Sequence, residues 1–250
     1  MRDQEHTPTT EDIIAEAQRR LHDKKRPGSR PDRQNWAIKL NQGVFWLARH
    51  WLALFNILVG VYTGGAILTP VMMKFGFEGV GNMLYAFYNP FCHQYPFRSW
   101  FLFGPHMARP LTEPISVLKM NQLTQFTGNE NIGYKMALCQ RDIAMYGIIF
   151  VAGLVYGLLR SRKTLRPLPM WIYFVFGIVP IMLDGGIQWL SYLMWVLFPG
   201  LVAYPFETIP LMRTLTGTLF GLGIVATSYP YINEFFEDVR ITLQQRFHWT

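Results

Sequence analysis

The sequence predicts an all-α, polytopic membrane protein: a bundle of four transmembrane helices with an additional re-entrant or interfacial hairpin on its outer side. Composition is the first reason, since half of the 250 residues are hydrophobic and only 16% are charged, whereas a soluble domain carries about 25% charged residues. Distribution is the second, because charges crowd into the first forty residues and long later stretches carry almost none. The third is length: four of these stretches reach the ~20 residues that a helix needs to cross a bilayer.

Each predicted membrane-spanning helix is a mainly apolar stretch bounded by polar residues. The four run from about Trp51 to Met73, Met136 to Leu159, Leu168 to Gln188 and Leu211 to Tyr231. Gly-x-x-x-Gly pairs occur in the first, second and fourth. Because small residues four positions apart let helices approach closely in lipid, these pairs predict packing inside the bundle.

The predicted hairpin is a fifth apolar stretch, Val80 to Phe103, which is interrupted by Pro90, Pro96 and the polar sequence CHQ. Proline breaks the interior of a helix, so this stretch is interpreted as a re-entrant or interfacial hairpin and not as a span. The shorter stretch from Trp189 to Val202 is interpreted in the same way.

Basic residues predict the orientation in the membrane. They concentrate before the first predicted span, between the second and third (Arg160 to Arg166) and after the fourth (Arg240 and Arg246). Because cytoplasmic loops carry an excess of lysine and arginine, both termini are predicted to be cytoplasmic, in the plasma or inner membrane of the cell. This placement accounts for the net charge of +7 without nucleic acid, for which the sequence shows no recognition pattern.

Three parts are expected along the chain. Residues 1–40 form a cytoplasmic arm, which contains an amphipathic helix from about Glu11 to Leu21 and a basic linker. Residues 41–232 form the transmembrane domain, and residues 233–250 form a cytoplasmic amphipathic tail. Amphipathic ends of this kind either lie on the membrane surface or dock onto a partner subunit.

Polar residues near the outer ends of the predicted segments indicate a functional site. Charged side chains are costly in membrane segments, so each one is a candidate for function. Four separate segments bring such residues to one level, which predicts a polar pocket at the outer leaflet. The candidates are Cys92, His93, Gln94, Arg98, Cys139, Arg141, Asp142, Asp184, Gln188, Glu207 and Arg213.

Four motifs between about Phe87 and Gly221 give the chain a family resemblance: CHQYPFRSW, CQRDIAMYG, DGGIQ and RTLTG. Together they resemble an uncharacterised family of small bacterial and archaeal polytopic membrane proteins, known as a domain of unknown function. The family is marked by Cys-His-Gln…Arg-Ser, Cys-x-Arg and Asp-Gly-x-x-Gln elements. The resemblance implies a membrane fold and no particular activity. Family members often have a second cysteine after the arginine, where this chain has Asp142.

Three interpretations are open for the two cysteines, Cys92 and Cys139. Thiols outside the cytoplasm tend to be oxidised, which favours a structural disulfide. Alternatively, the pair joins His93, Asp142 or His106 in a mixed site for zinc or a similar divalent metal. A third interpretation is thiol exchange, because nearby positive charge lowers the pKa of a thiol.

Three arginines and three carboxylates among the candidates also allow two interpretations. Buried charges survive when paired, so mutual ion pairing is one, and binding of an anionic group by the arginines is the other. The sequence therefore predicts an integral membrane protein of unknown activity whose outward-facing pocket binds a metal ion or an anionic lipid-like molecule. The alternatives are an accessory or assembly subunit of a larger membrane complex and a membrane thiol oxidoreductase. Common catalytic motifs are absent from the sequence, so the question of enzyme activity stays open.

Overall fold

The computed structural model describes residues 11, 14–16, 18–19, 31–111, 122–162, 165–198, 200–201 and 204–249. Five of the eleven residues of the predicted amphipathic helix of the arm, at positions 12, 13, 17, 20 and 21, therefore lie outside the described residues. The elements are α2 (Pro31–Lys74), α3 (Glu78–Tyr88), a 3₁₀ turn (Pro96–Arg98), β1 (Ser99–Leu102), β2 (Gly128–Asn129), β3 (Gly133–Cys139), α5 (Gln140–Arg160), α6 (Met170–Tyr173), a π-helical turn (Phe174–Ile178), α7 (Val179–Leu197) and α8 (Pro210–Phe247).

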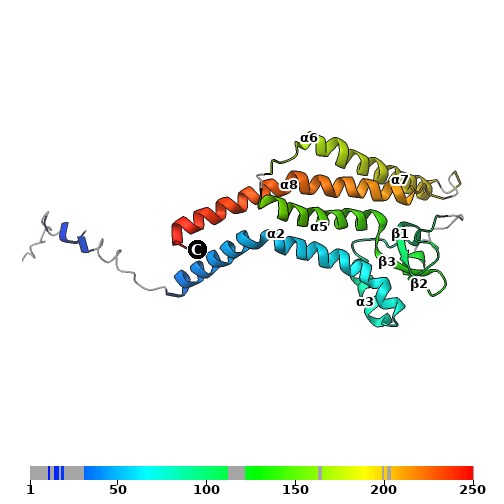
Figure 1. The fold of residues 1–250 in the computed structure, drawn as a ribbon, viewed down its shortest axis with the longest axis horizontal. Coiled ribbons are helices and arrows are strands. Elements are labelled where there is room, and N and C mark those ends of the chain that lie inside the picture. Colours follow the sequence, from blue (N-terminus) through cyan, green and yellow to red (C-terminus); the bar gives the residue numbers. More distant parts are fainter. Residues whose placement is uncertain are drawn as a thin grey trace, which may run out of the picture.

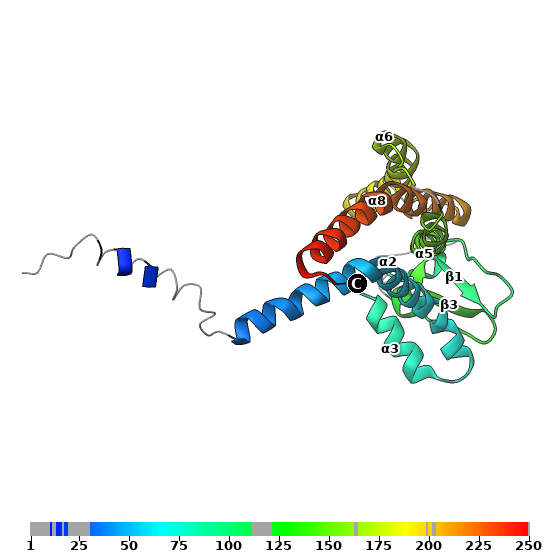
Figure 2. The same cartoon turned by 60° about the vertical axis from the view of Figure 1, so that its left-hand side comes forward.

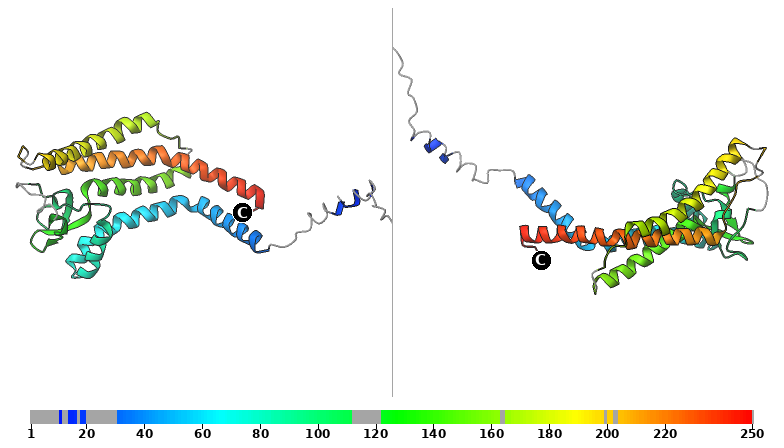
Figure 3. Two further views of the ribbon diagram at one scale, coloured as in Figure 1. Left: turned by 180° about the vertical axis from the view of Figure 1, so that it is seen from behind. Right: turned by 90° about the horizontal axis from the view of Figure 1, so that it is seen from above.

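The long helical segments lie side by side in the order α2, α5, α8 and α6–α7 (Figure 1), and the same order is seen from behind (Figure 3). The small sheet and α3 lie at one end of this row, and the C-terminal end of α8 lies at the other (Figure 1). Helix α5 lies between α2 and α8 (Figure 2) and packs against both. In chain order, the long segments α2, α5, α6–α7 and α8 run in alternating directions along the bundle (Figure 1).

Within the described part of the chain, three helical segments are long and apolar enough to cross a membrane: Asn35–Lys74, Gln140–Arg160 and Met170–Leu197. In the third of these, only 11% of the most apolar window is buried inside the protein. Apolar surfaces of this extent are covered by lipid or by partners, in agreement with the predicted membrane protein. Helix α8 carries Arg213 and many threonines and glycines and is not among the three. The prediction of four transmembrane helices is therefore confirmed for three of them.

The boundaries of two predicted spans were wrong. Residues 136–139, placed in the second span, form the end of strand β3, and helix α5 begins at Gln140. This strand end is apolar and almost fully buried, so its sequence resembles the start of a buried helix. The third span extends through α6 and α7 to Leu197. The stretch from Trp189 to Val202 was predicted as a separate interfacial segment, but its residues up to Leu197 continue helix α7.

The all-α prediction missed a three-stranded antiparallel sheet with the strand order β1-β3-β2. Its edge strand β1 comes from the stretch predicted as a re-entrant or interfacial hairpin, which consists of α3, a turn and β1. The hairpin is therefore not confirmed. The strands are short, and four to seven apolar residues do not distinguish a strand from a buried helix.

Two clusters of buried side chains hold the bundle and the sheet together. Trp51, Ile149 and Tyr229 belong to the first, which joins α2, α5 and α8. The second joins α2, α3 and β3 through residues such as Ala66, Tyr85 and Leu138, the last of them fully buried. The second cluster fixes the sheet on the end of the bundle, where the candidate site lies.

Lys135 is fully buried in the central strand β3. Its Nζ donates hydrogen bonds to the carbonyl oxygens of Gln94 at 2.6 Å and Thr124 at 2.8 Å. Burial lowers the pKa of this ammonium from 10.5 to about 8. The side chain thus ties the turn after α3 to the sheet and retains a charge whose burial is costly.

The stability of the protein is expected to rise with pH from about pH 8 towards pH 10. The folded protein releases the Lys135 proton near pH 8 and the unfolded chain near 10.5, so the unfolded state binds more protons across this interval. The slope approaches about 1 kcal/mol per pH unit. Thermal unfolding of the wild type and of Lys135→Met in detergent measures it. The variant is expected to lack this part of the slope, and equal slopes would refute the assignment to Lys135.

Candidate functional site

Cys92, Cys139 and Asp142 meet at the end of the bundle that carries the sheet. Their sulfur and carboxylate oxygen ligand atoms all lie within 4.8 Å of one another. Cys92 follows α3, and its backbone N–H donates to the carbonyl of Tyr88 at 3.0 Å. Cys139 ends β3, is paired with Ser99 of β1 and directly precedes α5, whose first turn contains Asp142. The sheet and the start of α5 thus position the group.

Both cysteines are free thiols in the structure. The pKa of Cys92 lies below its ordinary value, mainly because the thiol of Cys139 donates a hydrogen bond to it. The pKa of Cys139 lies well above its ordinary value, because it donates that bond and is buried. Cys92 is therefore the member of the pair that loses its proton first.

His93 and Gln94 do not join this group. Among the described residues, the close set of potential metal ligands consists of the two cysteines and Asp142. His93 is exposed and stacks on Tyr95, with ring centroids 5.6 Å apart. Gln94 is buried, and its Nε2 donates to the carbonyl of Tyr85 at 2.8 Å. Neighbours in the same turn therefore point to different surroundings.

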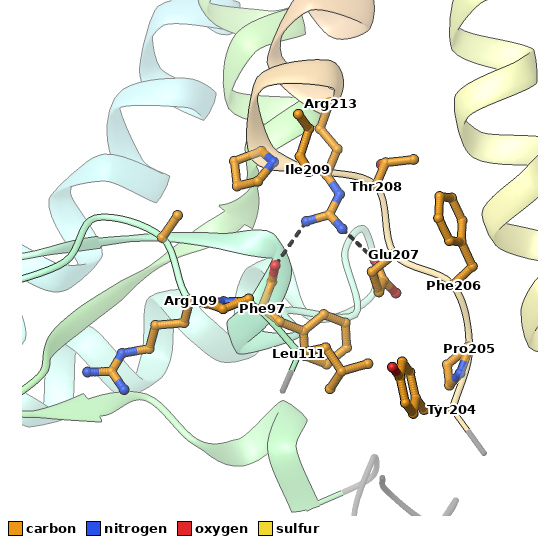
Figure 4. A pocket seen from close by; sticks show the side chains of 13 residues that line it. Phe97, Arg109, Leu111, Tyr204, Pro205, Phe206, Glu207, Thr208, Ile209 and Arg213 are labelled. Carbon is orange, nitrogen blue, oxygen red and sulfur yellow. Dashed lines mark hydrogen bonds and ion pairs between the residues drawn. The ribbon is translucent and has the colours of Figure 1, made fainter. Parts of the chain in front are cut away.

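An ion-pair network beside the cysteine group is centred on Glu207. Arg98 donates from Nε and Nη2 to this carboxylate at distances between 2.5 and 3.0 Å. Arg213 donates from Nη2 at 2.5 Å (Figure 4), and the hydroxyl of Tyr192 donates at 2.6 Å. Arg213 also reaches the carbonyl of Phe97 at 2.9 Å. The Glu207 carboxylate thus connects three parts of the protein: helix α7, helix α8 and the turn that precedes β1.

Asp184 is the centre of the other half of the network. It accepts from Nε and Nη2 of Arg141 at 3.1 and 2.5 Å and from the hydroxyl of Thr216 at 3.0 Å. Gln188 connects the two halves, since its Oε1 accepts from Arg141 at 3.0 Å and its Nε2 lies 3.3 Å from Glu207. Arg141 lies between Cys139 and Asp142 in the sequence, so the network and the cysteine group share the start of α5.

Sequence reasoning missed four members of this network. Tyr192 and Thr216 bind the two carboxylates directly. Gln140 accepts from Arg213 at 3.1 Å, and the hydroxyl of Thr208 accepts from Nε2 of Gln188 at 2.7 Å. A signal for Tyr192 was present, because Asp184, Gln188 and Tyr192 are spaced four residues apart and therefore lie on one helix face. Asp142, predicted as a possible ion-pair partner of the arginines, lies instead with the cysteines.

Two cavities border the network. One has a volume of about 380 Å³ and lies beside Glu207 and Arg213, where Arg109 and Phe97 also line it (Figure 4). The other has a volume of about 260 Å³ and is lined by residues that include His93, Arg98 and Arg141. The second cavity connects both halves of the network with the turn that holds Cys92.

Comparisons with known proteins agree with this picture of a membrane bundle. Residues 131–227, which include Cys139, Asp184 and Arg213, match the model of a family described as "Predicted membrane protein (DUF2085)". The resemblance to an uncharacterised membrane family is confirmed. An uncharacterized protein of Methanocaldococcus jannaschii is similar to the chain, with 24% identity over 151 residues, 60% of this chain and 69% of that protein. No solved structure matches the chain significantly.

The DUF2085 match covers only part of the cysteine group. It contains β3, α5, α7 and the first half of α8, with Cys139, Asp142 and most of the ion-pair network. Cys92 and Arg98 precede it. The chain is thus a membrane protein similar to a family of unknown function, and its activity has to be argued from the residues of the site.

Proposed function

We propose that this membrane protein binds a divalent metal ion of the zinc type through Cys92, Cys139 and Asp142. The observation that supports the proposal is that the three ligand atoms lie within 4.8 Å of one another, at the junction of α3, β3 and α5. Thiolates and carboxylates are established zinc ligands, and thiolates select soft and borderline metals over magnesium or calcium. The predicted fourth ligand, His93, is not in the group.

A three-ligand site leaves one coordination position for water or another molecule. Three protein ligands and an open position are characteristic of catalytic zinc, whereas structural zinc is usually held by four. The proposed site therefore binds a metal that stays accessible to a further ligand. Arg141 follows Cys139 by two positions and pairs with Asp184, so the ion-pair network would hold the first turn of α5 in place around the metal.

Elemental analysis of the purified chain tests this proposal. We expect about one zinc ion per chain when the protein is prepared with zinc and a reducing agent, and a substoichiometric content in Cys92→Ser, Cys139→Ser and Asp142→Asn. Asp238→Asn, which changes an aspartate in the C-terminal part of α8, is the matched control and should retain the metal. A wild type without bound zinc, or variants that retain it, would contradict the proposal.

The same preparation distinguishes the two alternatives predicted from the sequence. Mass mapping of a Cys92–Cys139 disulfide that forms and is reduced reversibly would favour a thiol oxidoreductase, for which the proximity of two free thiols is the supporting observation. Migration as part of a larger assembly in mild detergent would favour an accessory subunit. The proposed topology, with α8 as a fourth span and both termini in the cytoplasm, is supported by the alternating directions of the helices and by the positive-inside rule.

A further inference from the structure

The smaller cavity beside the ion-pair network has the composition of an anion site. It has a volume of about 260 Å³, and its lining includes His93, Arg98, Arg141, Gly185, Trp189 and Tyr192. Tyr192 holds the guanidinium of Arg98 against its ring, with Arg98 Cζ 4.9 Å from the ring centroid. Two fixed guanidinium groups thus border a cavity of the size of a small ligand group.

Both guanidinium groups have unused donors. Arg98 uses Nε and Nη2 for Glu207, and Arg141 uses Nε and Nη2 for Asp184 and Gln188. Each arginine has five N–H donors in a planar fork. Neither Nη1 donates a hydrogen bond to any acceptor in the part of the chain that the structure describes. Two pairs of N–H groups therefore remain for a ligand.

The charges of the network are unbalanced. Three arginines, Arg98, Arg141 and Arg213, face two carboxylates, Asp184 and Glu207. Asp142 lies near Arg141 but within the cysteine group, and among the described residues it forms no ion pair with these arginines. The network thus has an excess of one positive charge, and a buried charge without a counter-charge is unfavourable. An anion in the cavity would supply that counter-charge.

Gly185 keeps the cavity open next to Arg141. A Cβ atom added at this position would lie 3.3 Å from Arg141 Nη1. At the following residue, Gly186, an added Cβ would meet nothing within 4 Å. The two adjacent glycines therefore differ in whether a side chain would enter the cavity, although both lie in helix α7.

We propose that this cavity binds a phosphate group through the Nη1 atoms of Arg98 and Arg141. Phosphate oxygens accept charge-assisted hydrogen bonds from guanidinium groups, and the dianion offsets the excess positive charge of the network. His93 stands at the same cavity as an additional donor. The phosphate comes either from free inorganic phosphate or from the headgroup of an anionic lipid such as phosphatidic acid.

Binding measurements on the purified full chain test this proposal, with a chelator present so that no metal takes part. One arm titrates inorganic phosphate by calorimetry in a neutral detergent. The other compares nanodiscs of phosphatidylcholine with and without phosphatidic acid, and measures retained lipid by mass spectrometry. Saturable binding in the first arm identifies free phosphate, and retention of phosphatidic acid alone identifies a lipid headgroup. Absence of binding in both arms overturns the proposal.

Gly185→Leu and Gly186→Leu are the matched pair of variants. The first is expected to weaken binding at least tenfold, because its side chain enters the cavity, while the second leaves the affinity unchanged. Equal affinities in the two variants overturn the proposal. If Gly185→Leu does not fold, Arg98→Lys is the deciding variant, because it retains the charge beside Glu207 and removes Nη1. Unchanged affinity for phosphate in Arg98→Lys also overturns the proposal. Cys92→Ser should bind phosphate normally, which separates this result from that of the metal site.

Discussion

Replacement of Glu207 by glutamine is expected to lower the free energy of unfolding by about 3–5 kcal/mol. Its carboxylate accepts from Arg98, Arg213 and Tyr192. The side chains of Arg213 and Glu207 are only 3% and 9% exposed, so the change leaves a buried guanidinium without its counter-charge. Removal of one partner from a buried pair is far more costly than removal of both. The shift of the thermal unfolding midpoint in detergent measures the effect.

Glu237→Gln is the control for this prediction. Glu237 forms an ion pair with Arg240 on α8, where the two side chains are 47% and 36% exposed. Exposed pairs contribute about 0–1 kcal/mol, so the control should scarcely change the unfolding midpoint. A loss in Glu207→Gln no larger than that of the control would show that the network contributes little to the stability of the bundle.

Gly221→Ala is expected to have the second large effect, a destabilisation of about 3 kcal/mol that also disturbs the site. A Cβ atom at Gly221 would lie 2.5 Å from the carbonyl oxygen of Met145 and 2.6 Å from a side-chain carbon of Ile148, both on α5. Backbone atoms cannot move aside as a flexible side chain does, so α8 and α5 have to separate. Overpacking of this kind typically costs 1–3 kcal/mol and sometimes more.

Gly147→Ala provides the matched control for helix separation. Gly147 also lies in α5, but an added Cβ there meets nothing within 4 Å. Alanine favours a helix over glycine by roughly 0.5–1 kcal/mol, so this variant should equal or slightly exceed the wild type in stability. Gly221→Ala with wild-type stability would contradict the close packing of α5 against α8.

The sequence was sufficient to predict the membrane character, three of the spans and close helix packing at the Gly-x-x-x-Gly pairs. The membrane character and the spans follow from composition and length, because a helix exposed to lipid needs apolar residues along its whole length. The Gly217 and Gly221 pair predicted helix packing because small residues let helices approach closely. The structure identifies α5 as the partner, since added Cβ atoms at both positions would meet its backbone atoms. These features depend on local sequence alone.

The sequence could not predict which charged residues pair with one another. Arg98 pairs with Glu207, which is 109 positions away, and Arg141 pairs with Asp184, 43 positions away. Charge counts cannot choose among such partners, because the choice depends on how the helices are arranged. The sheet was missed for a related reason: β3 is buried by contacts with α2 and α3, and its apolar residues were read as a helix.

X-ray absorption at the zinc edge of the purified, zinc-loaded chain tests the central claim most directly, namely that Cys92, Cys139 and Asp142 form one metal site. The proposal predicts two sulfur ligands at about 2.3 Å together with oxygen ligands at about 2.0–2.2 Å. In the zinc that Cys92→Ser still binds, the sulfur contribution per zinc ion should fall by half. A zinc environment of nitrogen and oxygen atoms alone, or one that Cys92→Ser leaves unchanged, would contradict it.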